Sequence, residues 1–175
     1  HIVPDENDMF EVGDEAYVVV DSRHTQRIMA AFGHTEKTAR RIIISGGGNI
    51  GMTLAKILQE TVHGIQIKII EQREDRAQTL SEELNNIVVL NGNTLDREVL
   101  RESSVETAET FIALMNNDEN NILASLLAKQ YGCERVITLV NNNAYYPLVG
   151  PLGIDVMVSP KSIVVANIMQ HIRRG

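Results

Sequence analysis

SGGGNIG, residues 45–51, is the stretch that decides the fold of this chain. It follows a run of isoleucines and carries the spacing G-x-G-x-x-G at Gly46, Gly48 and Gly51. Between a strand and a helix, Gly46 permits a tight turn, Gly48 lets the backbone approach a pyrophosphate, and Gly51 lets the helix lie close to the sheet. The free N–H groups at the helix start then face an anion. The stretch therefore predicts a phosphate-binding turn.

A second element of the same pattern stands at Glu71, twenty residues after Gly51 and at the end of the next apolar run. A carboxylate at this point accepts hydrogen bonds from both hydroxyls of an adenosine ribose and repels a 2′-phosphate. It favours NAD(H), or another adenine nucleotide with an unphosphorylated ribose, over NADP(H). Arg73 and Arg76 keep NADP(H) open as an alternative, and both are equally compatible with a solvated helix face.

Short apolar runs alternate with amphipathic segments on either side of these two motifs, which is typical of a parallel sheet covered by helices. The predicted strands are 42–45, 66–71, 87–91, 110–115, 135–140 and 156–158. The predicted helices are 49–60, 73–84, 96–102, 119–131, 145–152 and 161–171. Six strands joined by right-handed crossovers predict an α/β fold with a Rossmann-type, doubly wound parallel sheet.

Two polar loops are expected at the same edge as the glycine turn, because each follows a predicted strand. They place Asn93 and Thr94 after the third strand, and Met115 and Asn116 after the fourth. Such short polar groups suit an adenine edge or ribose hydroxyls. The alternative is helix capping, by Asn93 or Thr94 for the helix near 96 and by Asn117 or Asp118 for the helix near 119. Asn120 and Asn121 fit a helix surface as well as a ligand contact.

The composition excludes several classes of partner. The chain has 175 residues, 43% of them hydrophobic, and a formal net charge of −7, so it offers no general basic field for nucleic acid or anionic lipid. No run of 18 apolar residues and no signal peptide is evident, and we expect a cytoplasmic protein whose membrane partner, if it has one, is another protein. The single cysteine, Cys133, is expected to be a small buried residue without a redox role.

The first thirty or so residues predict only a turn, a strand at 16–20 and a short helix, which together cannot close a core. We expect residues 1–33 to be the end of a preceding domain, 34–40 to be a polar linker, and 41–175 to be the dinucleotide-binding domain.

A catalytic centre is not indicated. The chain has no Tyr-x-x-x-Lys pair and no cysteine–histidine pairing, and no second domain that would bring a substrate to a nicotinamide is recognisable. None of the histidines falls at the carboxyl end of a predicted strand, and each is expected to be an isolated surface residue; they are His1, His24, His34, His63 and His171. We therefore expect no catalytic residue, no metal site, and a regulatory role.

Beyond these local patterns, SGGGNIG, IKIIEQREDRAQTLSEEL, VVLNGNTLDREVL, FIALMNNDENNILASLLAKQYG and GIDVMVSPKSIVVANIM resemble the RCK (TrkA-N) domain family in order and spacing. The leading segment, with VGDEAYVVV and a helix ending in FG, resembles the end of the TrkA-C domain that precedes a second such unit. The chain is thus similar to the middle of a peripheral subunit with two such units in tandem.

The resemblance implies a cytoplasmic regulatory subunit at the inner face of the cell membrane. It would gate an integral-membrane potassium transporter of the Trk type and assemble as a homo-oligomeric dimer or ring. NAD(H) is the preferred nucleotide, with ATP or ADP as alternatives. The implied binding residues are Gly46, Gly47, Gly48, Asn49, Ile50, Gly51, Glu71, Gln72, Arg73, Asn93, Thr94, Met115 and Asn116.

Two departures from the family pattern stand at Met115, where threonine is frequent, and at Leu139, where the fifth strand often has arginine. Both imply weaker contacts to phosphates. Two other functions stay open on the sequence alone: a fragment of an NAD-dependent oxidoreductase, and a nucleotide-free Rossmann scaffold used only for assembly.

Overall fold

A computed structural model of the chain describes residue 9 and residues 20–21, 24–33, 38–149 and 151–172. The chain forms two compact units, His1–Thr38 and Ala39–Gly175. In the first unit, helix α1 spans Thr25–Ala31. The strand predicted at 16–20 lies outside the described residues except for Val20, so the remnant of a preceding TrkA-C domain stays a prediction.

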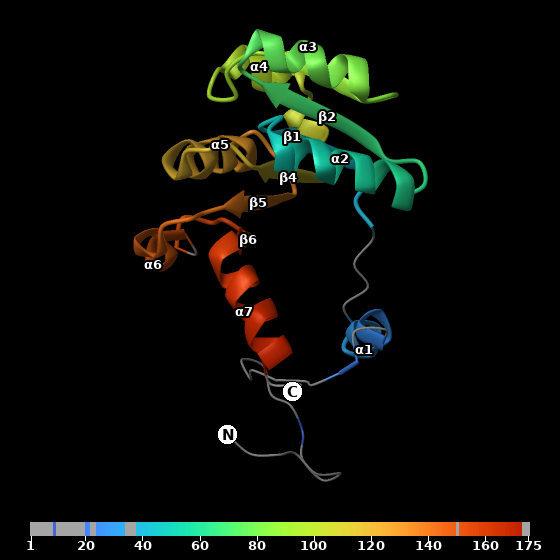
Figure 1. Cartoon of the computed structure of the whole chain (residues 1–175), viewed down its shortest axis with the longest axis vertical. Helices are drawn as coiled ribbons and strands as arrows, with labels where there is room; N and C mark the ends of the chain where they lie inside the picture. The colour runs from blue at the N-terminus through green and yellow to red at the C-terminus, as the bar shows by residue number, and fades with distance from the viewer. Residues whose placement is uncertain (1–8, 10–19, 22–23, 34–37, 150, 173–175) are drawn as a thin grey trace. The chain divides into compact units, whose positions relative to one another are not determined.

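The second unit is built on one sheet in which all the pairings are parallel. The strands run in the order β3-β2-β1-β4-β5-β6, which confirms the predicted Rossmann-type sheet (Figure 1). Between β3 and β4 the chain crosses from one edge back to the centre, so β1 and β4 mark the switch point where open α/β sheets bind ligands. The bounds of the strands are β1 Arg41–Ser45, β2 Gln66–Glu71, β3 Val88–Asn91, β4 Thr110–Ala113, β5 Arg135–Leu139 and β6 Val156–Val158.

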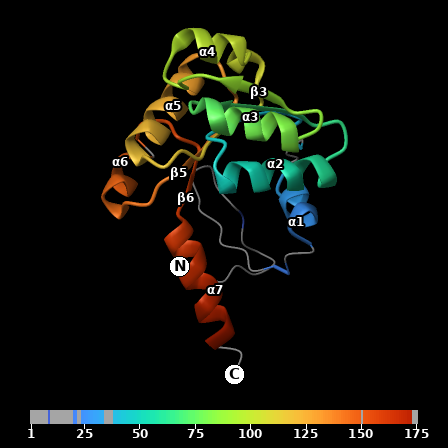
Figure 2. The same ribbon diagram turned by 45° about the horizontal axis from the view of Figure 1, so that its top comes forward.

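Helices cover both faces of the sheet. On one face lie α2 (Asn49–Thr61) and α3 (Glu74–Glu83), side by side in Figure 2 and joined by a Lys56–Glu83 ion pair of 3.0 Å. The other face is covered by α4, the 3₁₀ turn η2 and α5, and the turn η3 and helix α6 join the same apolar cluster. Their bounds are α4 Arg97–Glu102, η2 Val105–Thr107, α5 Asp118–Gln130, η3 Asn143–Tyr145 and α6 Tyr146–Val149.

Successive residues of β1 divide between two apolar cores, as the two-residue period of a strand requires. Ile42 and Ile44 join the cluster under α2 and α3, and Ile43 joins the cluster under α4 and α5. Since β1 is buried on both faces, its sequence is a continuous apolar run without alternation. Cys133 is buried in the second of these clusters, as expected.

One strand and one helix end at other residues than predicted. The fourth strand stops at Ala113, short of the predicted 115, since the Met115 backbone bonds to a side chain of α5. The helix predicted at 145–152 is also shorter than expected, since the turn η3 occupies its start and α6 ends at Val149.

The last helix, α7, spans Pro160–Ile172 and has no buried residue. Its exposed apolar side chains are Ile163, Val164, Val165, Ile168, Met169 and Ile172. Among the helices of the described residues, none combines the length and the apolar character that crossing a membrane would require.

Candidate nucleotide-binding site

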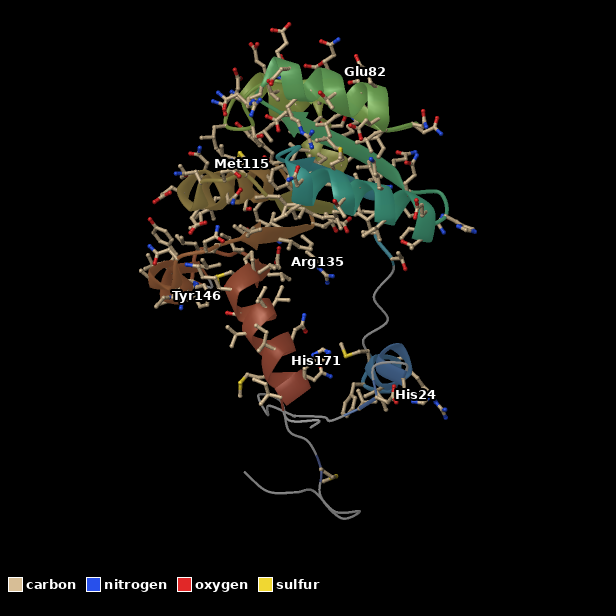
Figure 3. The ribbon with its side chains drawn as sticks, in the orientation of Figure 1. His24, Glu82, Met115, Arg135, Tyr146 and His171 are labelled. Atoms are coloured by element: carbon tan, nitrogen blue, oxygen red, sulfur yellow. The ribbon has the colours of Figure 1, made fainter. Side chains whose placement is uncertain are left out.

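The carboxyl ends of β1 to β4 surround a cavity of about 620 Å³. The arrowheads of β2 and β5 point to the same edge of the sheet in Figure 1, and Figure 3 places Met115 on this edge and Arg135 at the opposite end of β5. The cavity is lined by Gly46, Gly48, Asn49, Ile70, Glu71, Gln72, Arg73, Arg76, Thr94, Leu114, Met115, Asn116, Asn117 and Asn120.

The glycine turn has the geometry that its sequence predicts. Gly46 has φ +104°, and a Cβ there would meet backbone atoms of Leu114 at 2.9 Å. At Gly51 a Cβ would lie 2.1 Å from the carbonyl oxygen of Gly46, so only glycine lets α2 begin this close to the strand. A Cβ on Gly48, by contrast, would meet nothing within 4 Å. The first and last glycines are therefore required by packing, and the middle one faces open space.

Helix α2 begins at the cavity with its first amides open. Its N-cap is Gly48, which has no side chain to accept from them. In the described part of the chain, the N–H groups of Asn49, Ile50 and Gly51 donate to no protein acceptor, and the first intrahelical bond is from Met52 to Gly48. Open amides together with the helix dipole form an anion-binding feature.

Glu71, at the end of β2, joins the glycine turn to the start of α3. Its Oε2 accepts from the backbone N–H of Gly47 at 2.8 Å, and its Oε1 accepts from the N–H of Arg73 at 2.9 Å. An ionised carboxylate has about four acceptor positions, so these two bonds leave capacity for ribose hydroxyls. Glu71 thus holds the turn in place and presents negative charge to the cavity.

Two arginines flank this carboxylate. Arg76 donates from Nε to the carbonyl oxygen of Gly47 at 2.8 Å, so the N–H and the C=O of Gly47 are held by side chains of β2 and α3. Arg73 bonds to Asp75 through Nε at 3.1 Å and also through Nη2. Both arginines line the cavity.

The loop after β3 uses its polar groups internally. The Thr94 hydroxyl is buried and lies 2.8 Å from the hydroxyl of Ser45 at the end of β1. Asn93 accepts from the N–H of Leu95 in a tight local turn. The prediction that Asn93 or Thr94 caps the next helix is wrong, because Asp96 is the N-cap and accepts from Glu98 at 2.8 Å.

The start of α5 connects the ends of β4 and β5. Asn117 is its N-cap, as one of the sequence alternatives predicted, and accepts from Asn120. Asn121 is fully buried, accepts from Met115 N–H at 2.7 Å, and donates to the carbonyl oxygens of Met115 and Leu139. The alternative of a surface position for Asn121 is therefore wrong, whereas Asn120 is exposed and lines the cavity.

Asp118, in the first turn of α5, holds the segment after β5. Its carboxylate accepts from the backbone N–H groups of Asn141 and Asn142 and from the Asn141 side chain, at 2.8–3.0 Å. Burial alone raises the pKa of Asp118, but these bonds and the charge of Lys161 outweigh it, so the pKa lies below its usual value. The predicted alternative of Asp118 as the helix cap is wrong, because this carboxylate bonds to another loop.

The cavity brings together most, not all, of the residues predicted to bind a nucleotide. Gly47, Ile50, Gly51 and Asn93 do not line it: Gly47 and Gly51 are buried beneath the turn, and Ile50 and Asn93 are exposed beside it. Leu139 packs in the interior of the sheet and does not line the cavity either.

Five cavity residues were not among those predicted to bind: Ile70, Arg76, Leu114, Asn117 and Asn120. Ile70 and Leu114 immediately precede the predicted contacts Glu71 and Met115 in the sequence, so they lie at the same edge of the sheet. The sequence left Asn117 open between a helix cap and a ligand contact, and Asn120 open between a surface position and a ligand contact, because spacing does not show which face of α5 meets the cavity.

In the described residues, no group of three or more histidine, cysteine or carboxylate side chains is placed to hold a metal ion. The histidines for which a position is described, His24, His63 and His171, are all exposed.

The sequence profile of the TrkA-N domain matches residues 42–160, which run from β1 to the start of α7. The chain belongs to the TrkA-N domain family. The matched region of this chain includes the glycine turn, Glu71 and both polar loops.

Curated relatives extend the similarity over almost the whole chain. A Trk system potassium uptake protein TrkA from Azorhizobium caulinodans is 44% identical over 97% of this chain, and one from Vibrio alginolyticus is 40% identical over 99%. The chain spans only 37% of the length of either relative.

Solved structures share the fold of this TrkA-N domain. The TrkA-N domain of the inner membrane protein ybaL from Escherichia coli superposes with a TM-score of 0.68 at 16% identity, over 77% of this chain and 98% of that one. The GsuK channel bound to NAD gives 0.60 at 22% identity, over 76% and 25%. GsuK bound to ADP gives 0.62 at 24% identity, over 83% and 38%.

Proposed function

We propose that this chain is the nucleotide-sensing domain of a regulatory subunit, and that the cavity at the carboxyl edge binds NAD(H) in preference to ATP or ADP. One observation carries the proposal: the uncapped start of α2, through Gly48 and Asn49, and Glu71 line the same cavity. The amides suit a pyrophosphate, and the carboxylate suits the hydroxyls of an unphosphorylated ribose.

The binding residues that we propose are those predicted from the sequence that line the cavity, with Arg76, Asn117 and Asn120 added. The names of the GsuK structures record NAD and ADP as ligands of a protein with the same fold, which supports an adenine nucleotide here. The proposal includes no chemical step, so the domain would act by binding alone and not as an enzyme.

The relatives carry names of the Trk potassium uptake system, which supports a role in potassium transport for the whole protein. We propose that it lies in the cytoplasm at the inner face of the membrane and contacts an integral-membrane potassium transporter of the Trk type. The net charge of −7 argues against direct binding to anionic lipid or nucleic acid. A nucleotide would then shift transport only through different affinities for two states of the assembly.

Calorimetric titration of the chain with NADH, NAD⁺, ADP and ATP tests the ligand. We expect at least NADH to bind, and Gly48→Asp to weaken that binding about tenfold or more, because it sets a carboxylate where a phosphate is to sit. A Cβ at Gly48 meets nothing within 4 Å, so the fold should tolerate this change.

Asn85→Asp is the matched control, since it adds the same charge at an exposed position after α3, outside the cavity. It should leave NADH binding unchanged. Failure of all four nucleotides to bind at millimolar concentration would contradict the proposal and favour the nucleotide-free scaffold.

The transport role is tested in the full-length protein. Deletion should impair potassium uptake, and Gly48→Asp should alter the response of uptake to the nucleotide. Hydride transfer by the full-length protein to a carbonyl substrate, with normal uptake after deletion, would instead support the oxidoreductase.

We also propose a homo-oligomer, a dimer or a ring. The exposed apolar side chains of α7 support this, because a contiguous apolar surface of this kind is typical of an interface. Light scattering of the chain should give a mass of at least two copies, and a monomer at high micromolar concentration would contradict the proposal.

A further inference from the structure

The ribose end of the cavity contains two cations that a sequence pattern would assign to a phosphorylated ribose. Arg73 and Arg76 both line the cavity close to Glu71. In NADP-binding Rossmann domains, an arginine near this position accommodates the 2′-phosphate. What the two guanidinium groups contact therefore decides which ribose the site accepts.

Arg76 is committed to the glycine turn. Its Nε donates to the carbonyl oxygen of Gly47 at 2.8 Å, and its Nη2 lies 3.6 Å from the sulfur of Met52. Both contacts are partly buried. Turning this guanidinium outward to a ligand would cost the bond that holds the turn.

Arg73 has a different partner, the carboxylate of Asp75 two residues later. Two nitrogens of Arg73 bond to the two carboxylate oxygens, the geometry in which arginine recognises carboxylates and phosphates best. The side-chain hydrogen bond and charge of Asp75 raise the pKa of Arg73, and the bond from Arg73 lowers the pKa of Asp75. Asp75 occupies the Nε–Nη2 edge of Arg73, an edge that would otherwise be free to bind a phosphate.

The charges of the four side chains in these contacts balance. Glu71 and Asp75 are negative, and Arg73 and Arg76 are positive. A 2′-phosphate brings about −1.5 to −2 charge at pH 7 and finds no net positive field there. A ribose with free hydroxyls needs only hydrogen-bond acceptors, which Glu71 offers.

We propose that Asp75 is a specificity-determining residue, which engages Arg73 and so weakens the binding of nucleotides with a 2′-phosphate to this cavity. The inference rests on the proposed adenine-nucleotide function and deepens it. It assigns discrimination to two carboxylates: Glu71, which touches the ribose, and Asp75, which acts through Arg73.

Asp75→Asn is the test, because it removes the charge and keeps a side-chain oxygen at the start of α3. Titrated with NADPH at low salt, the variant should bind about threefold more tightly than the unmodified chain, the size expected for an exposed ion pair. NADH affinity should stay within about twofold, and the gain should shrink as salt screens the charges.

Two further variants test whether the gain in NADPH affinity comes from the Arg73–Asp75 pair. Glu83→Gln removes the same charge from the other end of α3, where Glu83 pairs with Lys56, and should leave NADPH affinity unchanged. Adding Arg73→Gln to Asp75→Asn should abolish the gain.

The outcomes separate the two proposals. If the chain binds NADH but Asp75→Asn and Glu83→Gln have equal NADPH affinity, the proposed role of Asp75 is overturned and the proposed function is not. An unmodified chain that binds neither NADH nor any other adenine nucleotide would overturn the proposed function and the specificity with it.

Discussion

Helices α2 and α5 begin at the same edge of the sheet, but they differ in whether side chains cap their first turns. At α2, Gly48 provides no cap, and in the described residues the amides of Asn49, Ile50 and Gly51 have no protein acceptor. At α5, Asn117 caps the helix, and Asp118 and Asn121 bond to the ends of the neighbouring strands.

The contrast indicates that the start of α5 stabilises the fold and that the start of α2 is available to a ligand. The buried side chains of Asp118 and Asn121 at the start of α5 are hydrogen-bonded within the protein, so this turn contributes to stability. The start of α2 lines the cavity at Gly48 and Asn49 instead, and its first donors have no acceptor among the described residues, so they can bond to a ligand. Substitutions at α5 should therefore lower the free energy of unfolding, and substitutions at the open face of α2 should lower nucleotide affinity.

The largest effect is expected at Asn121. Asn121→Leu keeps a similar volume and leaves the polar groups of Met115 and the Leu139 carbonyl without their partner in the interior. We expect the free energy of unfolding to fall by about 3 kcal/mol, measured by urea denaturation. Asn120→Ala, on the exposed side of the same turn, should cost less than about 0.5 kcal/mol. Equal losses in the two variants would show that the buried contacts of α5 carry no special weight.

A smaller loss of stability, combined with loss of binding, is expected at Gly51. The added methyl group of Gly51→Ala would lie 2.1 Å from the Gly46 carbonyl oxygen and would push α2 away from the turn. We expect about 2 kcal/mol of destabilisation, from urea denaturation, and loss of NADH binding in calorimetry. The contrast is with Gly48→Asp, which should weaken binding at nearly unchanged stability. If Gly51→Ala bound NADH normally, the close approach of α2 would be irrelevant to the site.

The smallest effect concerns pH. Because the folded state holds the pKa of Asp118 below its unfolded value, this carboxylate stabilises the fold above about pH 4, and the contribution is lost as pH falls through the folded pKa. Asp118→Asn should cost about 1–2 kcal/mol at pH 7, since an amide cannot accept from all the donors of Asn141 and Asn142.

Urea denaturation of both proteins from pH 7 to pH 3 checks this sign. The gap between the unmodified chain and Asp118→Asn should narrow on acidification. A gap that stays constant over this range would mean that Asp118 does not act through its charge.

Much of the fold was predictable because periodicity and glycine chemistry are local. The buried run at 42–45, followed by glycines at fixed spacing, left few alternatives to a strand, a turn and a helix. The ends of elements were less predictable: β4 stops early because the side chain of Asn121, six residues further on, takes the hydrogen bonds of Met115.

The residues of the candidate site likewise fall into those that the sequence predicted and those that it left undecided. Gly46, Gly48 and Glu71 were predicted because their spacing alone places them on one edge of a parallel sheet. Asn120 and Arg76 were left undecided, since the sequence does not say whether a helix residue faces the cavity, the solvent or the neighbouring turn.

By itself, the sequence determined the sheet, the glycine turn and the acidic residue at the end of β2, because each depends on backbone geometry within a few residues. Tertiary structure decided which polar groups are already used. Arg76 bonds to Gly47, Arg73 bonds to Asp75 and Asn121 bonds to two strand ends, whereas the amides of α2 stay open. Hydrogen-bond partners far apart in the chain meet only when the sheet assembles, so their pairing is a property of the fold.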